Sequence, residues 1–575
     1  MTRRIVSIVS AALLGVVILI FLGYFIIYVR YAAAVIQFPF DYDQGEGFEL
    51  NDSVLFAQGQ WPYRSNEVYP FYASNYPPLY HLWFVPFVWI FGPAYWYGRL
   101  FSFISTLVTA GAIGYAVYRP TRDAPLSLIA GLGYLASNYV YHIGPLFRQH
   151  ISMVMFETLA VVILAPLARA DTPGERRRLV FGLLCLLAAG YTKQLAYATV
   201  AACLVFVMAR GVKRGLIAAA IFIGVAAAIF GLINLATGGQ WWVNIILANI
   251  NEFIPGQMQG LYKQWYDLHA GWIWLSIVFI GVAAAQILRR PERDWSNALY
   301  GLWFTASAAN GALAGKWGAG ESYFMTSIAA MCICAGILVA QWRRAAAGWR
   351  PIGQWATALL IPLLLIAQAA RTIHLPTHGS LFGPVWRGVY NLAKVLPTEG
   401  IAAPLFEPFA RAQYADPEVR YLTLREQHYG VLGDVGVYVD SEGQLQYYDS
   451  QGYSQLGRPP NQIDTEQGRQ LLAYTQAAQG PVLTEEAAFA LLAGKAQVGN
   501  PTQLLNLAKN SMLNSTAMEA MVEAQAFEVI ILKAEFYPRP VLEAIGQHYQ
   551  SVATITMNGF DYRVLKPRAE AAHAP

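Results

Sequence analysis

Residues 5–29 read IVSIVSAALLGVVILIFLGYFIIYV, an unbroken apolar stretch directly behind Arg3 and Arg4. About 20 apolar residues are enough for a helix to cross the hydrocarbon core of a membrane. The stretch is too long for the core of a cleaved signal peptide, and no small-residue cleavage site follows it. It therefore predicts an uncleaved first transmembrane helix, and the two arginines predict a cytoplasmic N-terminus.

The composition of the chain separates a membrane part from a soluble part. Of its 575 residues, 56% are hydrophobic and only 13% are charged, and the mean hydropathy is +0.36. Soluble proteins carry roughly a quarter of charged residues. Basic residues outnumber acidic ones in residues 1–370, whereas the reverse holds in residues 371–575. This balance predicts an apolar membrane domain followed by a soluble domain, and it argues against a nucleic-acid-binding protein.

Clusters of basic residues define the predicted topology, because positively charged loops stay on the cytoplasmic side of a membrane. Six clusters lie along the membrane domain: Arg3–Arg4, Arg119/Arg122, Arg176–Arg178, Arg210/Lys213/Arg214, Arg289/Arg290/Arg293 and Arg343–Arg344. Residues 79–92 are predicted to be half-embedded, since a full hairpin there would place basic clusters outside. About eleven crossings then fit, at 5–29, 99–118, 124–141, 151–168, 179–191, 194–209, 216–235, 271–288, 295–312, 322–341 and 354–370.

The predicted fold class is a polytopic α-helical membrane protein with a C-terminal soluble domain. Residues 1–370 form the multi-pass domain with a first outer loop at 30–78, and residues 371–575 form an extracytoplasmic domain. Alternating strand and helix patterns predict that this second domain is α/β or α+β. Its predicted strands lie at 435–439, 445–448, 481–483, 527–532, 551–556 and 560–565, and its helices at 486–493, 502–509, 517–525 and 540–549.

Directly after the first helix comes FDYDQGEGFE (residues 40–49), which crowds four carboxylates into an apolar region. Asp41 and Asp43, two residues apart in an irregular loop, can converge on a divalent cation such as Mg²⁺ or Mn²⁺. One of the carboxylates can instead act as a general base that takes a proton from an acceptor hydroxyl or amine. The acids can equally form a solvated face at the membrane edge, and the short D-x-D motif alone favours that interpretation.

Ordered motifs behind this stretch reduce the weight of the solvated-face interpretation. GQWPYR (59–64), NYPPLYH (75–81) and FGPAYWYGRL (91–100) follow it, and FRQH (147–150), YTKQ (191–194) and GKWGAGESYF (315–324) come later. No single one of these motifs is specific. Their order within residues 35–340 resembles that of the GT-C superfamily of polyprenyl-phosphate-sugar-dependent glycosyltransferases. The resemblance is to the bacterial family 39-like branch, which is related to protein O-mannosyltransferases and to aminoarabinose transferases that act on lipid A.

The resemblance implies a GT-C fold in a bacterial cytoplasmic (inner) membrane, with a catalytic acid in the first outer loop. Asp43 matches the family's first acid; Asp41 and Glu46 are neighbours that can share its role, whereas Glu49 lies outside the predicted catalytic set. Where the family often carries a second acid, this chain has His150. A metal site of Asp41, Asp43 and His150 is one interpretation. The others make His150 a phosphate ligand or a neutral hydrogen-bonding residue.

Four cationic residues are candidates for binding the donor phosphate. Arg148, Lys193 and Lys316 each fall in a predicted outer turn beside apolar helices, and Arg99 lies near the outer end of a predicted crossing. A cation at membrane depth is costly and therefore indicates a function, unless it snorkels to the head groups. A lipid phosphate needs cationic partners at this depth, and arginine can bind it in a bidentate way. Snorkelling remains the alternative for each residue.

The predicted function is an inverting glycosyltransferase that moves a sugar from a polyprenyl-phosphate-linked donor to a glycan, lipid or protein acceptor outside the membrane. Asp43 would be the base, and the cations would stabilise the leaving phosphate. A divalent cation, Mg²⁺ or Mn²⁺, is an optional cofactor, and membrane lipids surround the protein. The alternative function is a transporter or flippase of a lipid-linked glycan. Against it, the sequence shows no matched pair of interrupted helices in two halves. His81 is predicted to be structural.

Overall fold

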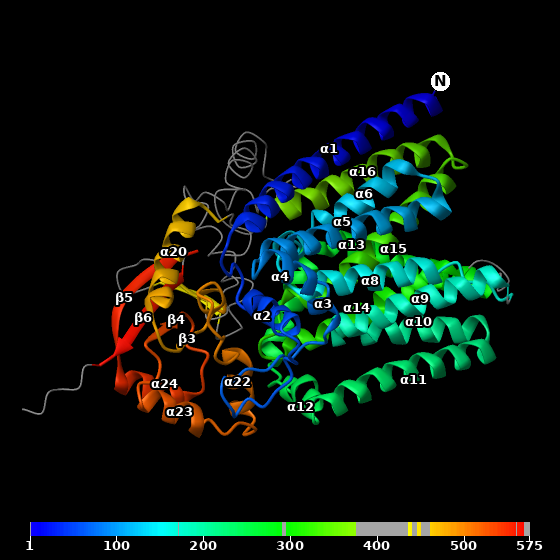
Figure 1. Cartoon of the computed structure of the whole chain (residues 1–575). Helices are drawn as coiled ribbons and strands as arrows, with labels where there is room; N and C mark the ends of the chain where they lie inside the picture. Colours follow the sequence, from blue (N-terminus) through cyan, green and yellow to red (C-terminus); the bar gives the residue numbers. More distant parts are fainter. Residues whose placement is uncertain are drawn as a thin grey trace, which may run out of the picture.

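The structure is a computed structural model that describes residues 2–170, 172–289, 295–374, 435–439, 445–449, 460–558 and 560–568. Long helices lie side by side in one bundle, and the C-terminal part of the chain covers one end of that bundle (Figure 1). The N-terminus lies at the opposite end. The molecule is therefore a helical bundle with a second, sheet-containing part at one of its ends.

A helix occurs at every segment that was predicted to cross the membrane. Among the described residues, six helices are long and apolar enough to cross, and four shorter apolar helices accompany them. The six candidate spans are Arg4–Gln37, Trp96–Thr121, Val212–Ala236, Leu268–Arg289, Glu321–Ala346 and Pro351–Ala369. These helices confirm a polytopic helical membrane protein, and the number of crossings stays a prediction.

The helices of the bundle differ in how much of their surface they bury. On α15 (Met325–Ala346) every side chain from Met325 to Ala340 is buried, whereas α11 (Val212–Ala236) at the edge of the bundle buries only Gly215 and Ala218. Apolar side chains that contact lipid need not be buried inside the protein, because the lipid chains are themselves apolar. The other bundle helices are α1 (Thr2–Gln37), α5 (Trp96–Thr121), α6 (Ala124–Leu135), α7 (Asn138–Ile143), α8 (Gln149–Leu164), α9 (Pro173–Thr192), α10 (Tyr197–Arg210), α13 (Pro255–Arg289), α14 (Ser296–Asn310) and α16 (Pro351–His374).

Two helices are longer than predicted. α1 continues to Gln37 because Tyr31, Ala32 and Val35 keep an apolar face packed against the bundle. α13 begins at Pro255, so that much of the predicted polar loop 236–270 is helical. In both cases the exposed side of the helix carries polar residues, so the apolar residues of its buried side do not form a continuous apolar run in the sequence. The loop that was predicted to start at residue 30 therefore starts after Gln37.

Turns between long helices lie at the end of the bundle that holds the N-terminus (Figure 1), and basic residues contact two of these turns. Arg343 forms an ion pair of 2.7 Å with Asp123 at the start of α6. Arg214 donates a hydrogen bond of 2.7 Å to the carbonyl of Ala168, at the turn between α8 and α9. The opposite end carries short helices and loops: α2 (Glu46–Ala57), α3 (Leu79–Leu82), α4 (Val85–Phe91), η1 (Gln194–Ala196), α12 (Gln240–Ile245), η2 (Leu247–Asn249), η3 (Gly311–Gly315) and η4 (Glu321–Phe324).

The C-terminal part contains a mixed four-stranded sheet with the strand order β3-β4-β6-β5. β3 pairs with β4 in parallel, and the other two pairings are antiparallel. A separate antiparallel pair joins β1 (Val435–Val439) to β2 (Leu445–Asp449). The sheet elements are β3 (Val482–Thr484), β4 (Val529–Leu532), β5 (Tyr549–Met557) and β6 (Phe560–Pro567); the helices are α20 (Gln462–Ala477), α21 (Ala488–Leu491), α22 (Pro501–Lys509), α23 (Thr516–Glu523) and α24 (Arg539–His548).

Most of the predicted elements of this part are present, and the mixed sheet makes it an α+β domain. The tip of the predicted hairpin, 440–444, lies outside the described residues. Helix α20 was missed, although Asn461 and Asp464 form a capping box at its start. Glu485, directly before the predicted helix 486–493, accepts hydrogen bonds from backbone N–H groups after β4.

Candidate functional site

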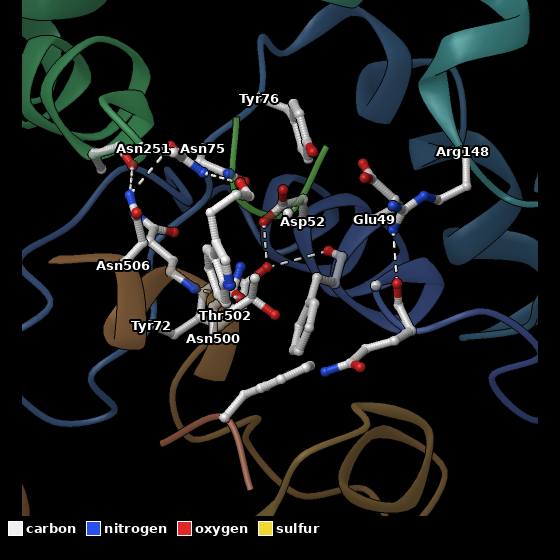
Figure 2. A pocket seen from close by; sticks show the side chains of 18 residues that line it. Glu49, Asp52, Tyr72, Asn75, Tyr76, Arg148, Asn251, Asn500, Thr502 and Asn506 are labelled. Atoms are coloured by element: carbon white, nitrogen blue, oxygen red, sulfur yellow. Dashed lines mark hydrogen bonds between the residues drawn. The ribbon is translucent and has the colours of Figure 1, made fainter. Parts of the chain in front are cut away.

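A cleft lies at the end of the bundle that the C-terminal domain covers. The cleft has a volume of about 840 Å³. The walls come from the first outer segment, from the loops near residues 250 and 317, and from α22 with the turn after β4 (Figure 2). Carboxamide and aromatic side chains make up most of the lining, and the charged members are Glu49, Asp52 and Arg148. Polar side chains thus line much of the cleft, and Arg148 is the cationic side chain of this lining.

Asp41 is buried beside this cleft, and its carboxylate accepts three hydrogen bonds. Oδ1 accepts from the N–H of Gly47 at 2.5 Å; Oδ2 accepts from the hydroxyl of Tyr95 at 2.8 Å and from the N–H of Ala488 at 3.0 Å. Burial raises the pKa of Asp41 to about 7, and the nearby carboxylate of Glu486 adds to the rise. Asp41 therefore ties the acidic stretch to α5 and to the C-terminal domain.

Glu46 and Arg99 form a fully buried ion pair. Nε and Nη2 of Arg99 donate to the two oxygens of Glu46 at 2.9 and 2.7 Å. Burial alone would raise the pKa of Glu46, but the guanidinium lowers it below its usual value. Backbone groups make the remaining hydrogen bonds of both side chains. The N–H groups of Tyr42, Asp43 and Phe147 donate to Glu46. Arg99 donates to the carbonyls of Val35, Phe38 and Phe40.

Asp43 is buried next to Arg148, which lines the cleft. Oδ2 of Asp43 lies 3.4 Å from Nε of Arg148. Nη1 of Arg148 donates to the carbonyl of Gln44 at 3.0 Å (Figure 2). Burial raises the pKa of Asp43 to about 7, although the charge of Arg148 opposes the rise. Gly45 leaves space for the guanidinium of Arg148, because a Cβ at position 45 would collide with Nη1 of Arg148. A carboxyl group that titrates near neutrality thus stands next to a cation that reaches the cleft.

The other predicted phosphate-binding cations lie in different surroundings. Lys193, at the end of α9, is buried, hydrogen-bonds Nε2 of His150 and lies 5.0 Å from the ring centre of Tyr76, which lines the cleft. Nζ of Lys316 donates to the carbonyl of Asn249 at 2.9 Å. Lys193 and His150 thus lie together near Arg148 and behind the lining of the cleft, whereas Lys316 secures the loop near residue 249 and Arg99 lies on α5.

Glu49, Asp52 and His81 form a group of potential metal ligands, the one such group of three among the described residues. Nε2 of His81 lies 2.6 Å from Oε2 of Glu49 and 3.5 Å from Oδ2 of Asp52. Two carboxylates and one imidazole suit Zn²⁺ or Mn²⁺. In the arrangement described, the direct hydrogen bond joins α2 to α3. Asp41, Asp43 and His150 do not form a comparable group within the described residues.

An apolar groove adjoins the cleft and encloses about 1200 Å³. Its wall includes Pro78, two residues after Tyr76, which lines the cleft. Its lining is almost entirely hydrophobic: Phe56, Trp61, Leu79, Leu82, Leu184, Leu187, Ala188, Ile229 and Ile233 contribute. A long hydrocarbon chain can therefore lie along α3, α9 and α11 with its head group at the cleft.

Carboxamide side chains fix the C-terminal domain over the cleft. Nδ2 of Asn506 donates to the carbonyl of Ala248 at 2.7 Å and to Oδ1 of Asn251 at 3.3 Å (Figure 2). Nε2 of Gln503 donates to Oδ1 of Asn244 at 2.7 Å. These bonds hold α22 against the loop that follows α12, so the domain forms one wall of the cleft.

Sequence reasoning missed the cluster of Glu49, Asp52 and His81. Glu49 and Asp52 are three residues apart, and this spacing places them on one face once Glu46–Ala57 is recognised as a helix. It also missed Glu486 and Lys533 of the C-terminal domain, which pair at 2.7 Å in a buried position. Nothing in the sequence connects these two residues to the acidic stretch.

No family model matches the sequence, and no curated protein matches it. Among solved structures, ArnT from Cupriavidus metallidurans in the apo state has a TM-score of 0.57 at 14% identity, over 96% of this chain and 98% of that chain. ArnT from the same organism, bound to undecaprenyl phosphate, has a TM-score of 0.54 at 15% identity, over 98% of this chain and 99% of that chain. At such identities the likeness shows the fold. The chain has the GT-C fold, in the arrangement seen in ArnT.

Proposed function

We propose that this chain is an inverting glycosyltransferase that moves a sugar from a polyprenyl phosphate to an acceptor on the extracytoplasmic face of the membrane. The observation that carries the proposal is the pair of Asp43 and Arg148, 3.4 Å apart, in which Arg148 lines a polar cleft and Asp43 is buried directly behind it. A carboxylate that accepts a proton and a cation that binds phosphate are the two groups that this transfer needs.

The transfer is a single displacement. The acceptor oxygen attacks the anomeric carbon and forms the new bond, while the bond from that carbon to the phosphate oxygen breaks. Asp43 takes the acceptor proton, and the polyprenyl phosphate leaves with the bonding electrons. Arg148 stabilises the charge that develops on this phosphate. One displacement at the anomeric carbon inverts its configuration.

The surrounding residues have supporting roles in this proposal. Lys193 lies near Arg148 and hydrogen-bonds His150. Burial and the charges of Lys193 and Arg148 lower the pKa of His150 well below its usual value, so His150 acts as a neutral hydrogen-bonding residue. Asp41 and Glu46, whose oxygens are occupied by hydrogen-bond donors, hold the loop that carries Asp43. Arg99 acts through Glu46 rather than on the phosphate. If a divalent cation binds, Glu49, Asp52 and His81 are the residues that would hold it, and it would supply further positive charge near the phosphate.

The apolar groove supports a lipid-linked donor. It adjoins the cleft and follows α9 and α11 along the bundle, as the prenyl chain of a donor requires. A solved ArnT structure contains undecaprenyl phosphate, and its fold is shared by this chain. The basic clusters at the opposite end of the bundle favour a cytoplasmic location for that end, and therefore an outer location for the cleft.

A transfer assay tests the proposal. The purified protein would be incubated with polyprenyl phosphates that carry single hexoses or pentoses, together with cell-envelope fractions as acceptors, and the release of free polyprenyl phosphate measured. Asp43→Asn is expected to abolish release while undecaprenyl phosphate still binds, and Arg148→Met is expected to weaken that binding. Glu252→Gln, a change of an exposed acid on the outer side, is the matched control. Full turnover by Asp43→Asn contradicts the assigned base, and lipid translocation without release favours a flippase.

A further inference from the structure

Carboxamide side chains dominate the polar lining of the cleft. Among the described residues six contribute: Gln44, Asn75, Asn251, Asn500, Gln503 and Asn506. Four of these, Asn251, Asn500, Gln503 and Asn506, form a surface that we call the amide wall. Figure 2 shows the three asparagines of this wall on the side of the cleft away from Arg148. A carboxamide is uncharged and offers a hydrogen-bond acceptor as well as two donors. The amide wall therefore suits a neutral ligand whose groups both donate and accept hydrogen bonds.

Gln503 carries an oxygen that the protein itself does not satisfy. The side chain is 3% exposed. Nε2 donates to Oδ1 of Asn244 at 2.7 Å, whereas Oε1 is buried and accepts no hydrogen bond from the described residues. The same holds for Oε1 of Gln44, which also lines the cleft. A buried oxygen left without a donor costs about 1–3 kcal/mol. Both oxygens are therefore positioned to accept hydrogen bonds from O–H groups of a molecule in the cleft.

Hydrogen bonds fix the direction of the other amides of the wall. Nδ2 of Asn251 donates to the carbonyl of Trp317 at 2.7 Å, and Oδ1 of Asn251 accepts from Asn506 at 3.3 Å. Oδ1 of Asn500 accepts from the N–H of Gln503 at 3.3 Å, as the N-cap of α22. Side chains that are already held in place lose little conformational entropy when a ligand binds. The amide wall is thus preorganised for binding.

Aromatic rings lie next to these amides. Trp317 and Phe536 both line the cleft, and their ring centroids are 6.2 Å apart in an edge-to-face arrangement. Aromatic side chains supply a large apolar surface to a binding site. A sugar ring carries C–H groups on its faces and hydroxyl groups at its edge, so it requires apolar and hydrogen-bonding partners together. Aromatic rings beside carboxamides match this requirement.

The charges at the cleft argue against a phosphorylated acceptor. Arg148 is the one cation of the described lining, and the proposed function assigns it to the donor phosphate. Two lysines beside Trp317 lie outside this lining and are engaged elsewhere. Nζ of Lys316 donates to a backbone carbonyl at 2.9 Å, and Nζ of Lys509 lies 4.4 Å from the ring centre of Trp317. Phosphate binding requires cationic partners. A second phosphate in the cleft would meet amides and acids instead.

We propose that the acceptor of the transfer is a hydroxyl group of a neutral glycan, and that the amide wall binds this glycan with Gln503 as a specificity-determining residue. The inference rests on the proposed function and names its acceptor. The hydroxyl oxygen forms a glycosidic bond to the anomeric carbon, the bond from that carbon to the donor phosphate breaks, and the hydroxyl proton goes to Asp43. A sugar hydroxyl is protonated at neutral pH, unlike a phosphate oxygen, and therefore needs a base.

The linkage of the transferred sugar tests the acceptor class. The purified protein would be given a polyprenyl phosphate with a radiolabelled sugar and, in separate reactions, envelope polysaccharide before and after removal of its phosphate groups, envelope protein and envelope lipid. We expect the label in a glycosidic bond to another sugar, to the same extent with and without phosphate groups. Label attached to an amino-acid side chain or through a phosphate group overturns the inference and leaves the proposed function intact.

Variants at the wall separate acceptor binding from donor binding. Gln503→Met removes the unpaired oxygen, and Thr502→Val removes a neighbouring hydroxyl of the lining while keeping the contact of Gln503 with Asn244. Each variant is expected to raise the KM for the polysaccharide about tenfold, the effect of about one hydrogen bond, with an unchanged donor KM. Gln525→Met, which removes a hydrogen bond to the carbonyl of His548, is the matched control. A wild-type KM for the polysaccharide in both variants, or a raised donor KM instead, overturns the assignment of the wall.

Binding gives a readout that needs no turnover. In titration calorimetry, dephosphorylated polysaccharide fragments should bind the wild type and the Gln525→Met control alike, and should bind Gln503→Met more weakly. If the wild type transfers sugar to no acceptor, the proposed function fails. Fragments that do not bind the wild type, or that bind Gln503→Met and Thr502→Val as tightly as the control, separately overturn the glycan site.

Discussion

At the scale of single residues, Asp43, as the proposed base, should set the pH range in which the acceptor can lose its proton. Burial raises its pKa to about 7, and only the ionised carboxylate acts as a base. Because the pKa is raised, the ionised fraction is about one-tenth at about pH 6 and about nine-tenths at about pH 8. We therefore expect kcat to rise with pH across this range, in a pH–rate profile measured at saturating donor.

The same profile tests the partner of Asp43. Arg148 opposes the rise of the Asp43 pKa, so Arg148→Met should move the midpoint of the profile to higher pH. Arg148→Lys keeps a charge and should shift the midpoint less. A wild-type rate that stays constant between about pH 6 and pH 8 would exclude Asp43 as the group that accepts the proton.

Glu46 differs from Asp43 because every oxygen of its carboxylate already has donors. Its pair with Arg99 is completely buried, and neutralising one member of such a pair costs about 3–5 kcal/mol. Glu46→Gln is expected to lower the free energy of unfolding by this amount, seen as a lower Tm in detergent, and Glu46→Gln/Arg99→Met should recover part of the loss. A stable Glu46→Gln protein without turnover would instead place Glu46 in the chemistry.

At the scale of elements, the turn before α2 determines where Arg148 can lie. Gly45 has a φ of 105°, and a side chain there would meet the guanidinium. Gly59, after the other end of α2, has a φ of 71° with nothing within 4 Å of its Cβ position. Gly45→Ala and Gly59→Ala therefore share a backbone strain of about 1 kcal/mol, and only the first displaces Arg148. We expect the donor KM to rise about tenfold in Gly45→Ala alone; equal effects would show that strain, not Arg148, is responsible.

The elements also show how far sequence reasoning reaches. The apolar segments predict the bundle helices, because burial in lipid requires long apolar runs. The turns predicted for Arg148 and Lys193 bring these two residues near each other. The cluster of Glu49 and His81 was not predictable, since it depends on α2 being a helix and on α3 packing against it. The amide wall depends on two folded parts meeting, and a local pattern carries no information about such a contact.

At the scale of the whole molecule, the groove and the cleft should bind different parts of one donor. Ala188→Trp narrows the groove between α3, α9 and α11. It is expected to raise the KM for a donor with a long prenyl chain by about tenfold and to leave a two-isoprene donor almost unaffected. Ile221→Trp, on the lipid-facing side of α11, is the control. The same increase for both donors would show that the groove does not hold the chain.

The hydrogen bond from Ala488 to Asp41 joins residues 447 positions apart, and this separation has a consequence for biosynthesis. A chain made at roughly 5–20 residues per second takes roughly 20–90 s to extend from one partner to the other. During this interval the first loop has left the ribosome, yet one of the donors to its carboxylates has not been synthesised. A nascent protein therefore passes through a period in which its helices are present and the proposed transfer site is incomplete. Activity would begin only when the last part of the chain has folded against the first.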